Sequence, residues 1–97
     1  MNVELEESFK KIQSHKGVVG VLIINKQGSV IKSTFDQEVS LSYSKVILDM
    51  FPKAHDLLKV NDNNDELSFF RVRSKDNDIM VTPDKDFFLM VVNKINK

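Results

Sequence analysis

Asp62, Asn64 and Glu66 are spaced like the first ligands of a calcium-binding EF-hand loop. That loop needs a glycine at its sixth position, for a sharp turn, and a bidentate glutamate at its twelfth. Counted from Asp62, these two positions hold Leu67 and Arg73. We therefore interpret the segment as a polar, solvated loop that follows a helix, and we predict no bound metal there.

Two pairs of aspartates have a spacing that could supply paired carboxylates for metal binding or acid–base catalysis. They are Asp76 with Asp78 and Asp84 with Asp86. Each pair lies in a short polar segment between two strand-like runs, where aspartate commonly accepts hydrogen bonds from nearby backbone N–H groups. The turn interpretation is therefore favoured over a catalytic one.

The two histidines, His15 and His55, lie in different predicted helices, and neither has a second histidine at the spacing of a metal site. His55 falls within an apolar stripe, which favours a hydrogen-bonded place in an interface over catalysis. Arg71 and Arg73 could hold an anion, but two arginines on one strand face more often protect a sheet edge or pair across an interface. With no cysteine, no nucleophile elbow and no phosphate-binding glycine loop, the sequence predicts no enzyme, cofactor or metal site.

The composition describes one small, electrically balanced domain that covers residues 1–97. Fourteen basic residues match fourteen acidic ones, and zero net charge argues against a nucleic-acid-binding protein, which needs a basic surface. Three early glutamates stand where a secretory signal is basic, so we expect the chain in the cytoplasm. The longest apolar run, residues 18–24, is far shorter than the ~20 residues that cross a bilayer, so no membrane insertion is expected.

The start of the chain has the signals of a short amphipathic helix. Asn2 can cap its first turn, and glutamates lie near its beginning and lysines near its end. Leu5, Phe9 and Ile12 form its apolar face, and Gly17 is expected to end it in a left-handed conformation. We expect this helix to lie on a sheet.

The other predicted elements are strands at residues 18–25 and 29–34, a helix at 41–60, and strands at 67–74, 79–83 and 87–93. The first and last of these strands are apolar without alternation, which is typical of central strands covered on both faces, and we expect them to be neighbours. The strand at 67–74 alternates and should lie near an edge. One helix should therefore cover each face, in the order α-β-β-α-β-β-β.

The helix at 41–60 has more apolar surface than one sheet can cover. One stripe consists of Tyr43, Ile47, Met50, Ala54 and Leu57, and a second, about 100° around the axis, consists of Leu48, Phe51, His55 and Leu58. A chain of this size with one other helix cannot bury both, so the second stripe is expected to meet another subunit. Pro52 predicts a bend near residues 48–52.

Two blocks of the sequence resemble the roadblock-type dynein light chains. The first covers residues 12–18 and continues through Gly20, Asn25 and Gly28 to residues 31–34; the second covers 67–69, 71–75, 79–81 and 83–86. This family, part of the roadblock and longin-like superfamily, implies an α+β sandwich in which a five-stranded antiparallel sheet lies between two helices. It also implies dimerisation through the second helix and the third strand into one ten-stranded sheet.

By this resemblance, the chain is a non-catalytic dynein light chain that pairs with itself or with a paralogous light chain and binds dynein intermediate chains. It would support motor assembly and cargo attachment, and through its partners contact the heavy chain and microtubules, in the cytoplasm and cytoskeleton or in a cilium or flagellar axoneme. The alternative, from the wider superfamily, is a scaffold or regulator of small GTPases. The expected dimer interface consists of Tyr43, Ile47, Met50, Phe51, Ala54, His55, Leu58, Phe69, Arg71 and Arg73.

Overall fold

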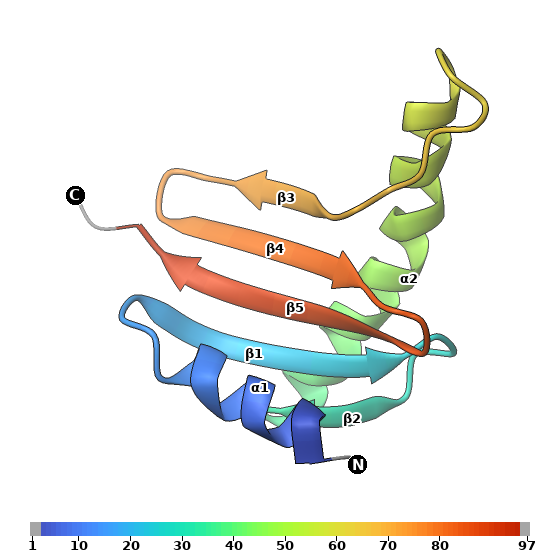
Figure 1. The fold of residues 1–97 in the computed structure, drawn as a ribbon. Coiled ribbons are helices and arrows are strands. Elements are labelled where there is room, and N and C mark those ends of the chain that lie inside the picture. Colours follow the sequence, from blue (N-terminus) through green and yellow to red (C-terminus); the bar gives the residue numbers. More distant parts are fainter. Residues whose placement is uncertain (1–2, 96–97) are drawn as a thin grey trace.

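The computed structural model describes residues 3–95 and has the predicted order of elements (Figure 1). These elements are α1 (Val3–Gln13), β1 (Val18–Asn25), β2 (Val30–Ser33), α2 (Gln37–Lys59), β3 (Phe70–Arg73), β4 (Asn77–Pro83) and β5 (Phe87–Lys94). The order α-β-β-α-β-β-β and the α+β class are therefore confirmed. The predicted helix cap, Asn2, lies outside the described residues.

The five strands form one antiparallel sheet in the order β2-β1-β5-β4-β3. β1 and β5 are the long central pair, with Leu22 opposite Met90 and Ile23 opposite Leu89. This confirms that the two uniformly apolar runs are neighbours, because a strand covered on both faces needs apolar side chains at successive positions. The short strands β2 and β3 form the two edges of the sheet (Figure 1).

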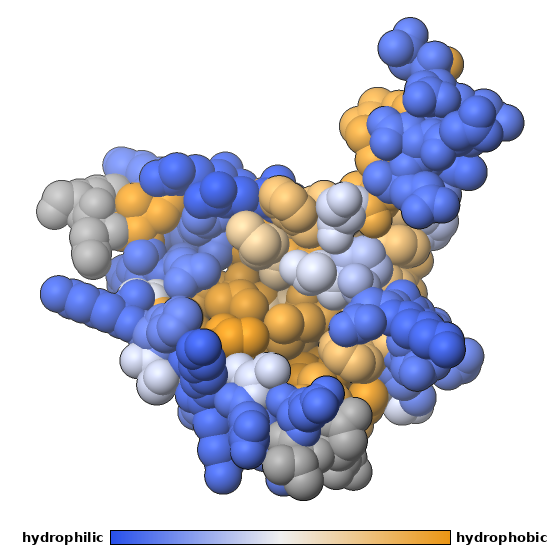
Figure 2. Space-filling view, in the orientation of Figure 1, coloured by the Kyte–Doolittle hydropathy of each residue, from blue (hydrophilic) through white to orange (hydrophobic). Residues whose placement is uncertain are grey.

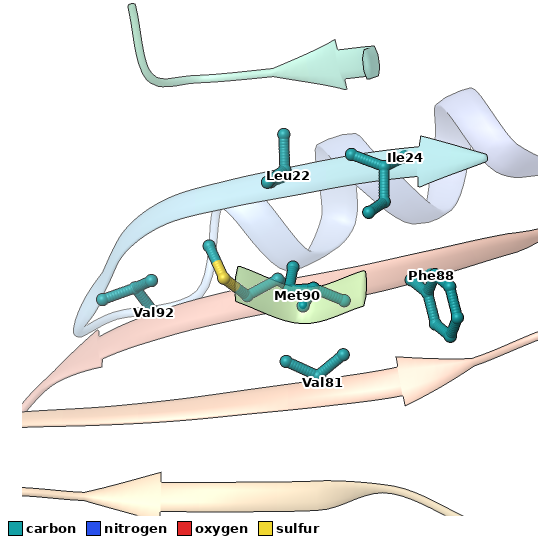
Figure 3. Packing of buried hydrophobic residues seen from close by; sticks show 7 residues of the cluster. Leu22, Ile24, Val81, Phe88, Met90 and Val92 are labelled. Atoms are coloured by element: carbon teal, nitrogen blue, oxygen red, sulfur yellow. The ribbon is translucent and has the colours of Figure 1, made fainter. Parts of the chain in front are cut away.

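The main hydrophobic core lies between the sheet and α2. Figure 3 shows the side chains that the sheet contributes: Leu22 and Ile24 from β1, Val81 from β4, and Phe88, Met90 and Val92 from β5. α2 contributes Ile47, which is only 3% exposed. Alternate residues of the central strands point to the opposite face, so each apolar run serves two separate cores.

α1 covers part of the opposite face of the sheet. Phe9 packs there against Val21 and Ile23, with Leu5 and Ile12 at the margin, as the apolar spacing of the helix predicts. α1 does not cover the whole face. Figure 2 shows apolar side chains gathered over the middle of the sheet beside this helix.

The end of α1 differs from the prediction. The helix ends at Gln13 and not at Gly17. Gly17 does adopt a left-handed conformation, with φ 92°, but it lies in the turn that leads into β1. Its carbonyl oxygen accepts a hydrogen bond from the N–H of Lys94 at 2.9 Å, so this glycine joins the turn to the end of β5.

α2 begins earlier than predicted because Asp36 caps it. The Asp36 carboxylate accepts a hydrogen bond from the backbone N–H of Val39 at 2.8 Å, which satisfies one of the free donors at the start of the helix. The helix then runs through Pro52 without interruption to Lys59. No helix within residues 3–95 combines the length and apolar character needed to cross a membrane.

The turn between β1 and β2 lies directly against α2. Gly28 has a left-handed conformation there, with φ 95°, and its carbonyl oxygen accepts a hydrogen bond from the Ser44 hydroxyl at 2.6 Å. A Cβ atom on Gly28 would lie 2.6 Å from Cδ1 of Leu48, which is too close for two carbon atoms. The backbone conformation therefore favours glycine at this position, and a larger residue would also have to displace the Leu48 side chain.

Candidate interaction surface

The inward face of α2 combines small polar side chains with one apolar anchor. Ser40, Ser44 and Ile47 lie on one side of the helix, each 2–3% exposed. The Ser40 hydroxyl lies 2.7 Å from the hydroxyl of Ser33 in β2, and Ser44 donates to the carbonyl oxygen of Gly28. These short, hydrogen-bonded side chains hold the helix close to the sheet and fix which of its faces points outward.

The stripe that contains Leu48 and Phe51 also faces this chain's own sheet, which the sequence did not predict. Both pack against the main core, and the centre of the Phe51 ring lies 4.7 Å from that of Phe88. Nζ of Lys26 lies 4.0 Å from the centre of the Phe88 ring and covers this end of the core. The reason is tertiary: the β1–β2 turn lies beside the helix and gives Leu48 a surface to cover.

Four of the large apolar side chains that α2 leaves exposed lie along one line, which we name the outer stripe: Val39, Val46, Met50 and Leu57. They are 39%, 53%, 37% and 74% exposed. Steps of seven and four residues keep these side chains on one face of a helix. A continuous exposed apolar line of this kind is typical of an interaction surface.

An apolar groove lies beside the outer stripe, between α2 and the β3 edge of the sheet. We name it the α2–β3 groove; its volume is about 220 Å³. It is lined by Tyr43, Val46, Ile47 and Met50 of the helix and by Phe70, Val72, Ile79, Val81 and Met90 of the sheet. None of these side chains is charged, so the groove fits apolar side chains of a partner.

β3 borders this groove with an unpaired edge, because among the described residues 3–95 it pairs with β4 alone. Val72 is 46% exposed on this strand, and Phe69, just before it, is 49% exposed. The Arg71 guanidinium donates two hydrogen bonds to the Asp78 carboxylate on β4, and the Nε–Oδ1 distance is 2.7 Å. The edge therefore presents apolar side chains beside an arginine whose charge is already paired.

The hydrogen bond from Arg71 lowers the pKa of Asp78, and the charges of Arg71 and Arg73 add to this effect. Partial burial of the Asp78 carboxyl, whose side chain is 14% exposed, opposes it. The same hydrogen bond raises the pKa of Arg71. Asp78 therefore stays ionised, and the pair stays formed, across the neutral pH range.

The structure divides the predicted interface residues into groups. Tyr43, Ile47 and Met50 line the α2–β3 groove, although Ile47 is buried, and Phe69, Arg71 and Arg73 are exposed at or beside the β3 edge. Ala54, His55 and Leu58 are half-buried near the end of α2, and Phe51 packs into the core. Arg71 and Arg73 alternate with the groove-lining Phe70 and Val72 and so lie on the other face of β3. The predicted interface residues near β3 therefore divide between the groove and the strand edge.

Sequence reasoning missed Val46 and gave Val72 no role in the interface. Val46 is the most exposed of the four groove-lining residues of α2, and Val72 lines the sheet side. The spacing of Val39, Tyr43, Val46 and Met50, in steps of four, three and four, is a helical stripe in its own right. The sequence did not single out this stripe because it shares residues and surface with the two other apolar stripes of the same helix.

Asp62 and Asp84, two of the aspartates singled out in the sequence, make local contacts with the backbone. Within residues 3–95, no three side chains of the types that bind metals are grouped closely enough to hold an ion. Oδ1 of Asp62 accepts a hydrogen bond from the Asn64 N–H at 3.0 Å, and Oδ1 of Asp84 accepts one from the Lys85 N–H at 2.7 Å. These contacts agree with the loop interpretation for Asp62 and with the turn interpretation for Asp84. The turn interpretation is wrong for Asp78, which lies in β4.

Comparison with known proteins agrees with this arrangement of helices, sheet and groove. A family model described as Roadblock/LC7 domain matches residues 4–94. The chain belongs to the Roadblock/LC7 domain family. The match confirms a roadblock domain as a class, which is broader than the dynein light chains that the sequence resembles.

Solved roadblock structures share the fold of this chain at low sequence identity. A Roadblock/LC7 domain from Streptomyces avermitilis is 9% identical, with a TM-score of 0.77 over 91% of this chain and 73% of that one. MglB from Myxococcus xanthus is 13% identical, with a TM-score of 0.80 over 95% and 76%. The gliding protein MglB from Thermus thermophilus is 12% identical, with a TM-score of 0.78 over 97% and 76%. At these identities the likeness shows the roadblock fold alone.

Proposed function

We propose that this roadblock domain is a non-catalytic, dimeric subunit that scaffolds or regulates a small GTPase in the cytoplasm. The observation that carries the proposal is the α2–β3 groove beside an unpaired strand edge, since such a surface is typical of a subunit whose function is contact. The similar solved structures are bacterial roadblock proteins, MglB among them. They support the wider roadblock superfamily, which includes GTPase regulators, over the dynein light chains.

In the proposed dimer, a two-fold axis pairs the β3 edges of two copies and packs their outer stripes together. Each β3 then gains the backbone partner that its outer edge lacks, and two five-stranded sheets join into one of ten strands. Val46 and Met50 fill the α2–β3 region at this seam. At this seam, Arg71 of each copy is paired with Asp78 of its own chain. This pairing reduces the repulsion between the positive charges of the two Arg71 side chains.

A dynein light chain is the second candidate, and the observation that favours it is the sequence of residues 71–75 and 83–86, which resembles that family. These residues form the end of β3 with its turn into β4, and the turn between β4 and β5. A dimer of this kind would hold two dynein intermediate chains together, and link through them to the heavy chain and microtubules of the cytoskeleton or a cilium. The two candidates differ in partner and share the fold.

Affinity purification of the tagged chain from its source cells, followed by identification of the co-purifying proteins, separates the two candidates. We expect a small GTPase without dynein chains. Dynein intermediate and heavy chains would establish the second candidate instead. The recovered GTPase is loaded either with GDP or with a non-hydrolysable GTP analogue, and each form is titrated with the purified chain. A regulator must bind the two states with different affinity. Equal affinities would contradict regulation.

A further inference from the structure

The outer side of β2, at the opposite edge of the sheet, pairs with no strand within residues 3–95 and with none in the proposed dimer. β2 pairs only with β1, and Figure 1 shows it at the end of the sheet away from β3. Half of the backbone N–H and C=O groups of an edge strand point away from the sheet. When the β3 edges of two copies meet, the two β2 strands become the outer edges of the joined sheet.

A groove of about 550 Å³ follows β2 on the side of α2. Its lining includes Val30, Ile31 and Ser33 of the strand and Phe35, Gln37 and Leu41 at the start of the helix. Val30, Ile31 and Leu41 are 37%, 41% and 46% exposed, so the groove offers apolar contacts along its length. Gln37 and serine side chains add polar groups, which distinguishes this groove from the wholly apolar α2–β3 groove.

β2 lacks the charge that commonly protects an edge strand from pairing. Its one charged residue, Lys32, is opposite Ile23 and so lies on the α1 face. Nζ of Lys32 is 5.0 Å from the centre of the Phe9 ring and 4.0 Å from a carboxylate oxygen of Glu6. Lys32 itself is among the residues that line the groove. Its Nζ, however, lies beside Phe9 and Glu6 of α1, so the charge is partly neutralised by Glu6 and opposes an incoming strand less than a free lysine would.

We infer that β2 is a docking site at which an extended segment of a partner protein adds to the sheet as a short strand. The outward-pointing backbone groups of β2 need hydrogen-bond partners, and the backbone of an extended chain can supply them. The backbone groups of a helix cannot, because they are already hydrogen-bonded to one another. Its alternate side chains fit over Val30 and Ile31 in the groove. The register shift in β2 opposite Ile23 and Ile24 twists this edge, so the added strand is short.

The occupant is a different protein and not a second copy of this chain. If β2 also paired with another copy while β3 formed the dimer seam, each sheet would extend at both ends and the assembly would not close. A different chain ends the sheet after one strand. The dimer then offers two equivalent strand-docking sites, one at each outer edge, and these sites are independent of whether the main partner is a GTPase.

A phage-displayed library of random linear peptides, selected on the purified chain, tests this inference. Counter-selection uses Ile31→Lys, which places a charge in the β2 groove at an exposed position and leaves the central strands unchanged. Val60→Lys, just after the end of α2, 84% exposed and outside both grooves, is the control. We expect a selected peptide with alternating apolar residues that binds Ile31→Lys at least tenfold more weakly than the wild-type chain, and binds Val60→Lys as tightly as wild type.

Amide chemical-shift mapping with the selected synthetic peptide then locates the site. We expect shifts at residues 30–33 and 37–41, and about tenfold weaker binding when alternate peptide nitrogens are methylated, because those backbone donors are lost. Selection of no peptide that distinguishes Ile31→Lys, shifts centred on β3, or full binding by the methylated peptide would each overturn the inference. Thermal unfolding of Ile31→Lys checks that the variant is folded, and Leu41→Lys provides a second change in the groove if it is not.

Discussion

At the scale of single residues, the fold depends on a few close approaches between backbone and side chain. The Cβ position of Gly20 lies only 2.1 Å from the ring of Phe35, so the ring occupies the space that any other residue would need. Thr34 fixes the same neighbourhood, because its hydroxyl oxygen accepts a hydrogen bond from the Val21 N–H at 2.9 Å. The segment between β2 and α2 is therefore held tightly against β1.

Replacement of Gly20 with alanine should lower the free energy of unfolding by about 1–3 kcal/mol, because the new methyl group overlaps the Phe35 ring. Urea unfolding followed by circular dichroism measures the change. The control is the same substitution in a Phe35→Ala background, where the ring is absent. We expect the alanine at position 20 to cost clearly less there, and an equal cost in both backgrounds would show that the ring is not the cause.

The ion pair between Arg71 and Asp78 predicts a pH dependence. The pKa of Asp78 is lower in the folded chain than in the unfolded chain. The pair therefore stabilises the fold fully at pH values above the pKa that Asp78 has in the unfolded chain. This stabilisation is lost as the pH falls through the lower pKa of the folded chain. In Arg71→Gln, the pKa of Asp78 should rise toward the ordinary value of an aspartate. Carbon NMR titration of the Asp78 carboxyl measures it; Arg73→Gln should change it less, because Arg73 contributes the smaller effect.

At the scale of elements, α2 carries apolar residues on nearly all sides but uses them for two purposes. Ile47 faces the sheet and is 3% exposed, whereas Val46, one residue earlier, is 53% exposed. One residue corresponds to about 100° of rotation, which is enough to move a side chain from the core to the surface. The last turns of α2 project past β3 in Figure 1, with Leu57 exposed.

Alanine at these two neighbouring positions should have different effects. Ile47→Ala removes buried methyl groups from the main core and should cost about 2–5 kcal/mol of stability. Val46→Ala should change the stability of the folded monomer by less than about 0.5 kcal/mol, because the side chain is exposed. Urea unfolding at low protein concentration, where self-association is minimal, checks both values. Similar losses for the two variants would contradict the orientation of α2.

At the scale of the whole molecule, the ninety-seven residues make a domain with two open sheet edges and one exposed helix face. A domain of this size buries a smaller share of its surface than a larger one and gains much from a partner. The two edges differ in chemistry, since the β3 edge meets a wholly apolar groove and the β2 edge a mixed one. This difference suits self-association at β3 and a foreign strand at β2.

The proposed dimer predicts a sedimentation mass near twice that of the monomer at micromolar concentration, and an unfolding temperature that rises with protein concentration. Met50→Asp should weaken self-association at least about 100-fold, because it would bury a carboxylate against apolar side chains of the partner. Analytical ultracentrifugation measures the dissociation constant. Lys45→Asp, at an exposed position off the outer stripe, is the control and should stay dimeric. A wild-type chain that sediments as a folded monomer would contradict the dimer.

The sequence by itself determined the element order, the central pair of strands and the edge character of β3. These features can be predicted locally, because the period of apolar residues along a short segment indicates whether it forms a helix, a buried strand or an edge strand. It also contained the roadblock resemblance, which the family match confirms for residues 4–94. The boundaries of α1, α2 and β3 were less accurate, since caps such as Asp36 decide them.

Only the tertiary structure decided which apolar face of α2 is buried. From the sequence, Leu48 and Phe51 form surplus surface, but the β1–β2 turn and Phe88 cover them. Val46 and Met50 remain open instead, because the sheet ends at β3 before it reaches that face of the helix. Helical periodicity places residues on a common face, but which face is buried depends on segments distant in the sequence. The candidate interface therefore became visible only when α2 and the sheet edge were seen together.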